Sequence, residues 1–166
     1  MTRETYIRIT GATRSALNRL PGKDKLLRLP TYLCAAVYMG ALLFLMLTRD
    51  VRLFRALIVP AVCFTVCTFL RPVIGRQRPY DRFGALPVGE YHPGKGKSMP
   101  SRHTASAAAI AMAVVYITPS LPLRAAMGLL CALIASLRVL AGQHYISDVL
   151  AALALSGVVS LIGYSI

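Results

Sequence analysis

The chain contains no tryptophan and few charged residues, since only 15% of its 166 residues are Asp, Glu, Lys or Arg. A soluble domain averages about 25% charged and about 45–50% apolar residues, whereas this chain is 56% hydrophobic. Acidic residues are the scarcest, with 6 Asp and Glu against 19 Lys and Arg and a formal net charge of +13. That charge alone would suit a nucleic-acid-binding domain, but the long apolar blocks argue against that class. The composition therefore predicts an integral membrane protein with basic edges and no nucleic-acid partner.

The cysteines predict neither a disulfide framework nor a metal site. All four lie inside apolar blocks, where a free cysteine behaves as a small hydrophobe, and no histidine or second cysteine pair lies near them in sequence: Cys34, Cys63, Cys67 and Cys131. A cleavable signal peptide is not expected either, because residues 1–28 carry seven Lys and Arg without an apolar run of the needed length.

Five apolar blocks predict an all-α fold, a polytopic bundle of about five transmembrane helices. About 20 apolar residues cross a bilayer core of roughly 30 Å, and the first block is uncharged for 20 residues between Arg28 and Arg49. Arginines at the start of the second block can snorkel to the interface, and prolines bound the turn after the third. The blocks are residues 29–48, 51–70, 103–118, 123–140 and 148–166.

Residues 1–28 are predicted to form a separate, basic amphipathic segment that lies on the membrane surface. Apolar residues such as Ile7 and Ile9 alternate there with arginines such as Arg8 and Arg14 over a rough helical period. A disordered basic tail is the alternative. Residues 29–166 are then expected to form one membrane domain, in which residues 72–102 include the loop between the second and third crossings.

Charge counting favours one topology. Five crossings place residues 1–28, 71–102 and 138–147 on the same side, and these segments carry 15 of the 19 Lys and Arg. The positive-inside rule would make that side cytoplasmic. A sixth crossing formed by the N-terminal segment would invert the orientation, so the sequence leaves the side open.

Ionisable residues meet the apolar blocks on that same side, at four helix ends. Such residues at membrane depth are costly and indicate a functional site. The planar guanidinium group of arginine presents paired N–H donors that suit phosphate oxygens. A helix that begins after Pro100, with Ser101 as its N-cap, would also offer an anion-binding site at its N-terminus. Anchoring to lipid headgroups would explain the arginines alone but not the neighbouring histidines. The residues are Arg71, Arg78, Ser101, Arg102, His103, Arg138, His144 and Asp148.

The histidines are the candidate reactive groups. His144 and Asp148 are four residues apart, on one helix face. A carboxylate there can hold the proton on one ring nitrogen and leave the other free as a nucleophile or base. His103 supplies a second titratable group, suited to protonating a leaving oxygen. His92 lies in a loop rich in Gly and Pro and is predicted to be a bystander.

These residues resemble the three motifs of the type 2 phosphatidic acid phosphatase family. The family carries Lys-x6-Arg-Pro, Pro-Ser-Gly-His and Ser-Arg-x5-His-x3-Asp. In the same order, the chain carries Arg71-x6-Arg78-Pro79, Pro100-Ser101-Arg102-His103 and Arg138-x5-His144-x3-Asp148. The motifs span residues 71–148 and are separated by intervals that suit a loop and then two crossing helices.

The chain departs from the family pattern at three positions. Arg71 replaces Lys and keeps the cation. Arg102 replaces Gly, which keeps the backbone amide and adds a guanidinium that either binds phosphate or points away. Leu137 replaces the Ser before Arg138. None of these changes touches the two histidines or the aspartate, so they bear more on substrate preference than on the reaction.

The resemblance implies a mechanism. His144 would attack phosphorus and form a phosphohistidine, with Asp148 fixing its tautomer, and His103 would protonate the leaving oxygen before water cleaves the phosphoenzyme. The phosphate-binding groups implied are Arg71, Arg78, Ser101, Arg102 and Arg138. The family needs no metal, and the sequence agrees because Asp148 is the only carboxylate in the motifs, whereas a two-metal site requires several. No cofactor is expected.

The position of the site at the membrane interface favours a phosphorylated lipid as substrate, with membrane lipids around the bundle. Undecaprenyl pyrophosphate, phosphatidic acid and phosphatidylglycerophosphate are candidates, in a multi-pass protein of the cell (inner) membrane. A lipid phosphotransferase using the same site is one alternative. A membrane protein that only binds or permeates anions is another. A vanadium-dependent haloperoxidase shares the phosphate pocket, but those proteins resemble soluble proteins, unlike this chain.

Overall fold

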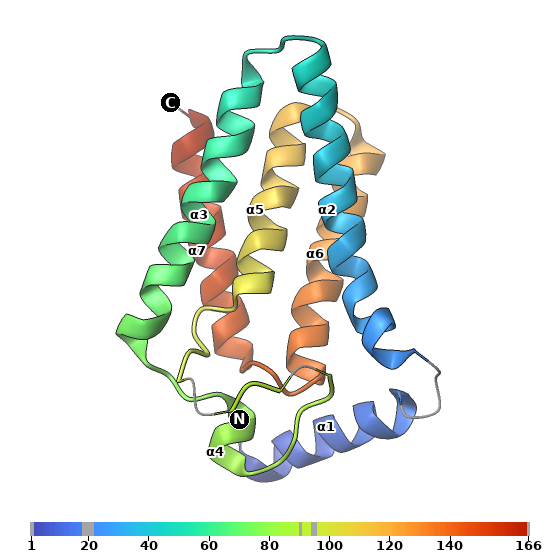
Figure 1. The fold of residues 1–166 in the computed structure, drawn as a ribbon, viewed down its shortest axis with the longest axis vertical. Coiled ribbons are helices and arrows are strands. Elements are labelled where there is room, and N and C mark those ends of the chain that lie inside the picture. The colour runs from blue at the N-terminus through green and yellow to red at the C-terminus, as the bar shows by residue number, and fades with distance from the viewer. Residues whose placement is uncertain (1, 18–21, 90, 94–95, 166) are drawn as a thin grey trace.

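The protein is an all-helical bundle in a computed structural model that describes residues 2–17, 22–89, 91–93 and 96–165. Figure 1 shows the long helices running side by side, with the helix nearest the N-terminus and a short helix lying at one end of the bundle. The helices of the described residues are α1 (Arg3–Leu17), α2 (Lys23–Leu47), α3 (Arg52–Ile74), α4 (Pro79–Phe83), α5 (Arg102–Ile117), α6 (Leu121–Leu140) and α7 (Ile146–Ser165). The predicted all-α, polytopic architecture is confirmed.

Four stretches are long and apolar enough to cross a membrane, among the residues that the structure describes. They are Leu27–Leu47, Arg52–Phe83, Leu121–Leu140 and Ile146–Ser165. Their outer faces expose large apolar side chains, including Phe44, Phe54, Phe69, Leu129 and Leu161, which a bilayer accommodates and water does not. The fifth predicted crossing, α5, is shorter at 16 residues.

Helix α5 is the centre of the bundle and packs against α2, α3, α6 and α7. Its buried face is built from alanines, including Ala105, Ala109 and Ala113, and such small residues let helix backbones approach closely. Ser156 of α7 donates a hydrogen bond of 2.9 Å to the Ala105 carbonyl across this contact. All four cysteines are buried, free thiols, as the sequence predicts.

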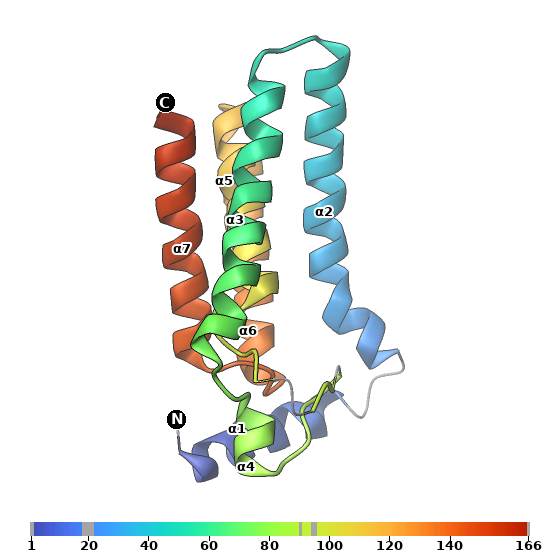
Figure 2. The same ribbon diagram turned by 60° about the vertical axis from the view of Figure 1, so that its left-hand side comes forward.

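Helix α1 lies across the end of the bundle, beside α4 (Figure 2). Its Tyr6 hydroxyl donates to the carbonyls of Ala85 and Gly142 at 3.0 and 3.3 Å. Gly142 has φ +73°, and a Cβ there would lie 2.5 Å from the Thr10 methyl carbon. The close approach and the left-handed backbone both require glycine at this turn. Helix α1 therefore packs directly beneath the turn that leads into α7.

The described residues of the segment 72–102 lie at the same end as α1, where Ala85 accepts a hydrogen bond from Tyr6. Helix α3 continues to Ile74 before Gly75 ends it in the left-handed region, at φ +61°. The short α4 follows and was not predicted. The Val88 amide then donates to the Ala141 carbonyl at 2.9 Å, which ties this segment to the α6–α7 turn. Residues 18–21 of the predicted N-terminal segment, and residues 90 and 94–95 of this loop, lie outside the described residues.

Candidate active site

The predicted site residues meet at the end of the bundle that α1 and α4 cover. Arg71 lies in the last turn of α3, Arg138 lies in the last turn of α6, and Asp148 lies in the first turn of α7. His103 lies within electrostatic range of Arg138, His144, Arg102 and Arg78. Arg71 lies within range of Arg78, Arg102 and Asp148. Three motifs separated in sequence are therefore brought to one place.

The backbone of the α6–α7 turn places His144. The Arg138 carbonyl accepts hydrogen bonds from the amides of both Gln143 and His144, at 3.1 and 3.2 Å. Two amides on one carbonyl close the end of α6 and turn the chain back toward the bundle. His144 is consequently buried, with 2% of its surface exposed. The fixed interval between Arg138 and His144 is the length of this turn.

Asp148 is fully buried, and its carboxylate has several partners. Its Oδ2 accepts hydrogen bonds from the Ser98 hydroxyl and, at 3.0 Å, from the Tyr145 amide. Its Oδ1 accepts from Arg76 Nη1 at 2.7 Å. His144 Nδ1 lies 3.4 Å from Oδ2, close enough for electrostatic interaction but without hydrogen-bond geometry. The two groups lie side by side, but the orienting hydrogen bond that the sequence predicts is not formed in this geometry; such bonds are often long before substrate binds.

The surroundings of His144 favour its neutral form. Burial lowers the pKa of His144, and the positive charges of Arg78 and Arg71 lower it further, although the neighbouring Asp148 raises it. The net shift is downward. A neutral imidazole whose Nδ1 faces a carboxylate keeps its proton there and leaves Nε2 with a free lone pair. The burial and the neighbouring arginines of His144 therefore favour the form in which an imidazole nitrogen carries a free lone pair.

Hydrogen-bond acceptors hold the guanidinium groups of Arg71 and Arg138, and an aromatic ring lies against that of Arg78. Arg71 donates through Nε to the Lys97 carbonyl at 3.0 Å and through Nη2 to the same oxygen. Arg138 Nη1 donates to Gln143 Oε1 at 2.7 Å. Arg78 lies over the Tyr80 ring at 5.6 Å, and its buried Nε donates to no residue that the structure describes. These arginines form a preorganised cationic cluster around the two histidines.

The start of α5 is arranged differently from the expectation in one respect. Ser101 occupies the N-cap position, as predicted, but its side chain makes no capping hydrogen bond. Its Oγ instead accepts from Thr104 Oγ1 at 3.1 Å, and its amide donates to the Asp148 carbonyl at 3.1 Å. The first amides of α5 still lack intrahelical partners. The Arg102 side chain is exposed and lies 5.9 Å from the Phe64 ring.

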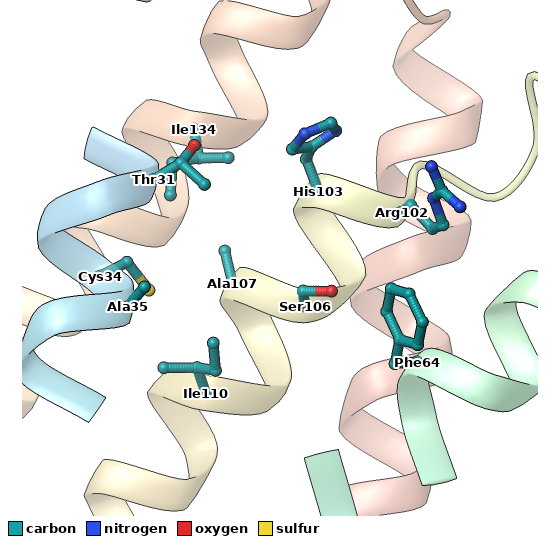
Figure 3. Close-up of a pocket in the computed structure, with 10 residues that line it drawn as sticks. All are labelled: Thr31, Cys34, Ala35, Phe64, Arg102, His103, Ser106, Ala107, Ile110 and Ile134. Carbon is teal, nitrogen blue, oxygen red and sulfur yellow. The ribbon is translucent and has the colours of Figure 1, made fainter. Parts of the chain in front are cut away.

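A mainly apolar cavity of about 380 Å³ adjoins His103 and Arg102 (Figure 3). Figure 3 shows both residues at the start of α5, with walls contributed by α2, α3 and α6. Ligand pockets typically occupy about 300–1,000 Å³, with a few polar groups in an apolar lining. The lining residues are Thr31, Cys34, Ala35, Phe64, Arg102, His103, Ser106, Ala107, Ile110 and Ile134.

Sequence reasoning missed three polar residues that organise the site, namely Arg76, Ser98 and Gln143. Arg76 and Ser98 contact Asp148, and Gln143 orients Arg138. Arg76 stands two residues before Arg78, in a segment rich in arginine. That position gives no sign that this arginine faces an acid rather than phosphate. Gln143 is easier to recognise from the sequence. It is a polar residue beside His144 in a short turn between two apolar helices, and a polar side chain that is buried there requires a hydrogen-bond partner.

Comparison with known proteins finds a matching family model and solved structures of similar fold. The model of the PAP2 superfamily matches residues 52–166. The crystal structure of Aquifex aeolicus LpxE is similar with a TM-score of 0.73 and 25% sequence identity, covering 98% of this chain and 94% of that one. A transmembrane PAP2 type phosphatidylglycerolphosphate phosphatase from Bacillus subtilis shares the fold, with a TM-score of 0.70, 18% identity and coverage of 99% and 86%. No curated protein sequence matches the chain significantly.

The chain therefore belongs to the PAP2 superfamily, whose model covers more than half of its length and all three motifs. It is a multi-pass membrane protein, as its apolar helices and the shared transmembrane fold show. Both similar structures cover nearly the whole chain, including α1 and α2, which lie outside the matched residues of the family model.

Proposed function

We propose that the protein is a lipid phosphatase that hydrolyses a phosphomonoester or pyrophosphate of a membrane lipid through a phosphohistidine at His144. The observation that carries this proposal is the buried pair of His144 and Asp148, 3.4 Å apart, beside His103 and the arginine cluster. Membership of the PAP2 superfamily supports a phosphatase.

The first step transfers the phosphoryl group to the protein. His144 Nε2 forms a bond to phosphorus while the bond from phosphorus to the leaving oxygen breaks. Asp148 keeps the proton on Nδ1, and protonated His103 gives its proton to the leaving oxygen. A phosphate dianion bound among the arginines favours the protonated form of His103.

The second step releases phosphate. Neutral His103 takes a proton from water while the water oxygen bonds to phosphorus and the bond to Nε2 breaks. Inorganic phosphate leaves, and both histidines return to their starting forms. Charge on the equatorial oxygens is stabilised by groups that are already oriented, which we assign as Arg71, Arg78, Ser101, Arg102 and Arg138.

Two observations support a lipid as the substrate. The site lies at the end of an apolar bundle, and the cavity beside His103 is lined mostly by apolar residues of α2, α5 and α6. The phosphate would meet the arginines while part of an acyl or prenyl tail enters this cavity. Undecaprenyl pyrophosphate, phosphatidic acid and phosphatidylglycerophosphate fit this chemistry, and the Bacillus subtilis structure is titled a phosphatidylglycerolphosphate phosphatase.

The domain arrangement follows from the same assignment. Residues 29–166 would form the catalytic membrane domain with its active-site loop at 72–102, and α1 would lie on the surface of the cell (inner) membrane. The last six residues of the predicted segment 1–28 belong instead to α2, which begins at Lys23. Helix α1 supports this because it lies across the bundle end instead of along it (Figure 2). No described part of residues 1–28 adds a sixth crossing.

Purified protein in detergent is expected to release inorganic phosphate from a lipid mono- or diphosphate in water, and chelator should leave the rate unchanged. The physical reason is that the only acid of the motifs, Asp148, is engaged by Arg76 and Ser98, so a metal would have no free carboxylate there. A panel of undecaprenyl pyrophosphate, phosphatidic acid and phosphatidylglycerophosphate, assayed for phosphate, provides the measurement.

Three outcomes of this panel would contradict the proposal. Turnover abolished by chelator would reject the metal-independent scheme. Phosphate transfer that requires a lipid or sugar acceptor would identify a phosphotransferase. Binding of every lipid phosphate without turnover would indicate an anion-binding membrane protein.

A further inference from the structure

Arg76 stands apart from the other arginines of the site because it contacts the start of α7. Its Nη1 donates to Asp148 Oδ1 and to Ser147 Oγ, each at 2.7 Å. Its guanidinium carbon also lies 4.2 Å from the centre of the Tyr145 ring. These three contacts surround the residues that follow His144 in the chain.

The contact with Arg76 makes the two oxygens of Asp148 inequivalent. Oδ1 faces Arg76, whereas Oδ2 accepts from Ser98 and the Tyr145 amide and lies 3.4 Å from His144 Nδ1. The Ser98 amide donates to the Arg76 carbonyl at 2.9 Å, so the two residues hold each other as well as the acid. Rotation of the carboxylate about its bond to Cβ would break both sets of hydrogen bonds.

We propose that Arg76 is a positioning residue for phosphoryl transfer, because its guanidinium holds the Asp148 carboxylate with Oδ2 directed at His144. This inference rests on the proposed function. Arg76 acts through Asp148, because its Nη1 donates to the acid and to the neighbouring Ser147.

The charge of Arg76 has a second consequence, for the protonation of His144. The charged groups that act on His144 are Asp148 from α7, Arg71 from α3, Arg78 from the loop and His103 from α5. Arg76 forms an ion pair with Asp148 at 2.7 Å, so its positive charge opposes the effect of the carboxylate on His144. Without it, the full carboxylate charge would stabilise protonated His144 and raise its pKa. Because neutral His144 is the nucleophile, the acid limb of the pH profile would then move to higher pH.

Arg76→Ala is expected to lower kcat about tenfold to a hundredfold, the cost of a nucleophile misplaced by about 1 Å, with KM changed less than about twofold. Guanidinium ion at millimolar concentration should restore much of kcat by filling the vacated site. The acid limb of kcat/KM should move to higher pH. Arg76→Lys keeps the charge but loses the planar fork, so its kcat should lie between those of the wild type and Arg76→Ala.

Ser147→Ala provides the matched control. It removes the exposed partner of Arg76 and leaves the bond to Asp148, so kcat and the pH profile should remain those of the wild type. Unchanged kcat and pH profile in both Arg76 variants would overturn the inference, as would a raised KM with normal kcat, which would indicate a substrate-binding arginine. Failure of the wild type to release phosphate would instead overturn the proposed function.

Discussion

Replacing His144 with alanine is expected to reduce phosphate release by at least about 10⁴-fold, the scale on which enzymes lose their nucleophile. No other described residue can take its place, because His103 approaches from α5 and lacks the orienting carboxylate that lies 3.4 Å from His144. Substrate should still bind, since the arginine cluster is untouched. Steady-state kcat on the preferred lipid phosphate, with binding measured separately, provides the test.

His92→Ala is the matched control for this substitution. His92 is exposed, and its backbone amide and carbonyl, not its ring, make the hydrogen bonds to the Tyr80 hydroxyl. Its removal should leave kcat within about twofold of the wild type. A His144→Ala protein that is folded and retains more than about a hundredth of the wild-type activity would remove His144 as nucleophile.

Asp148→Asn should lower kcat by about 10³–10⁴-fold, as when an orienting aspartate becomes an amide in a hydrolase triad. The amide can direct an N–H group at Nδ1 and so force the proton onto Nε2, where the nucleophilic lone pair is needed. It also leaves Arg76 without its acid. Both effects act on the state of His144, so kcat should fall much more than substrate affinity.

Because Asp148 is fully buried, its substitution also requires a check of folding. Elution as a single species and a cooperative thermal transition would show that the variant retains its structure. Asp50→Asn is the control, since Asp50 is paired with Arg52 in the turn between α2 and α3, away from the site. Near-normal turnover in folded Asp148→Asn would show that the carboxylate does not orient the nucleophile.

Most of the fold could be predicted from the sequence because physical boundaries mark its helices. Arginines and prolines bracket most of the apolar blocks, and the observed α2, α5 and α6 begin or end within a few residues of those marks. Helix α7 has no such mark but begins two residues before the predicted block that starts at Asp148. The exception is α4, whose five residues make little more than one turn. A helix that short has no periodicity to detect, and the packing of the loop against α1 decides whether it forms.

The site was predictable to the extent that it is encoded in spacing. His144 and Asp148 are separated by one helical turn, and Arg138 and His144 are separated by the length of the α6–α7 turn. These intervals in the sequence therefore place the three residues close together. The partners of Asp148 were not predictable, because Arg76 and Ser98 meet only through the path of the loop, where the Ser98 amide reaches the Arg76 carbonyl. The side chain of Ser101 also differs from the expectation, because Thr104 engages it instead of the helix amides.

The most direct measurement is a rapid acid- and alkali-quench experiment with a lipid substrate that carries a radiolabelled phosphoryl group. We expect label on the peptide that contains His144, stable in alkali and lost in acid, appearing before inorganic phosphate and absent from His144→Ala. Label on another residue, or single turnovers that release phosphate with no labelled protein at any time, would contradict a phosphohistidine at His144.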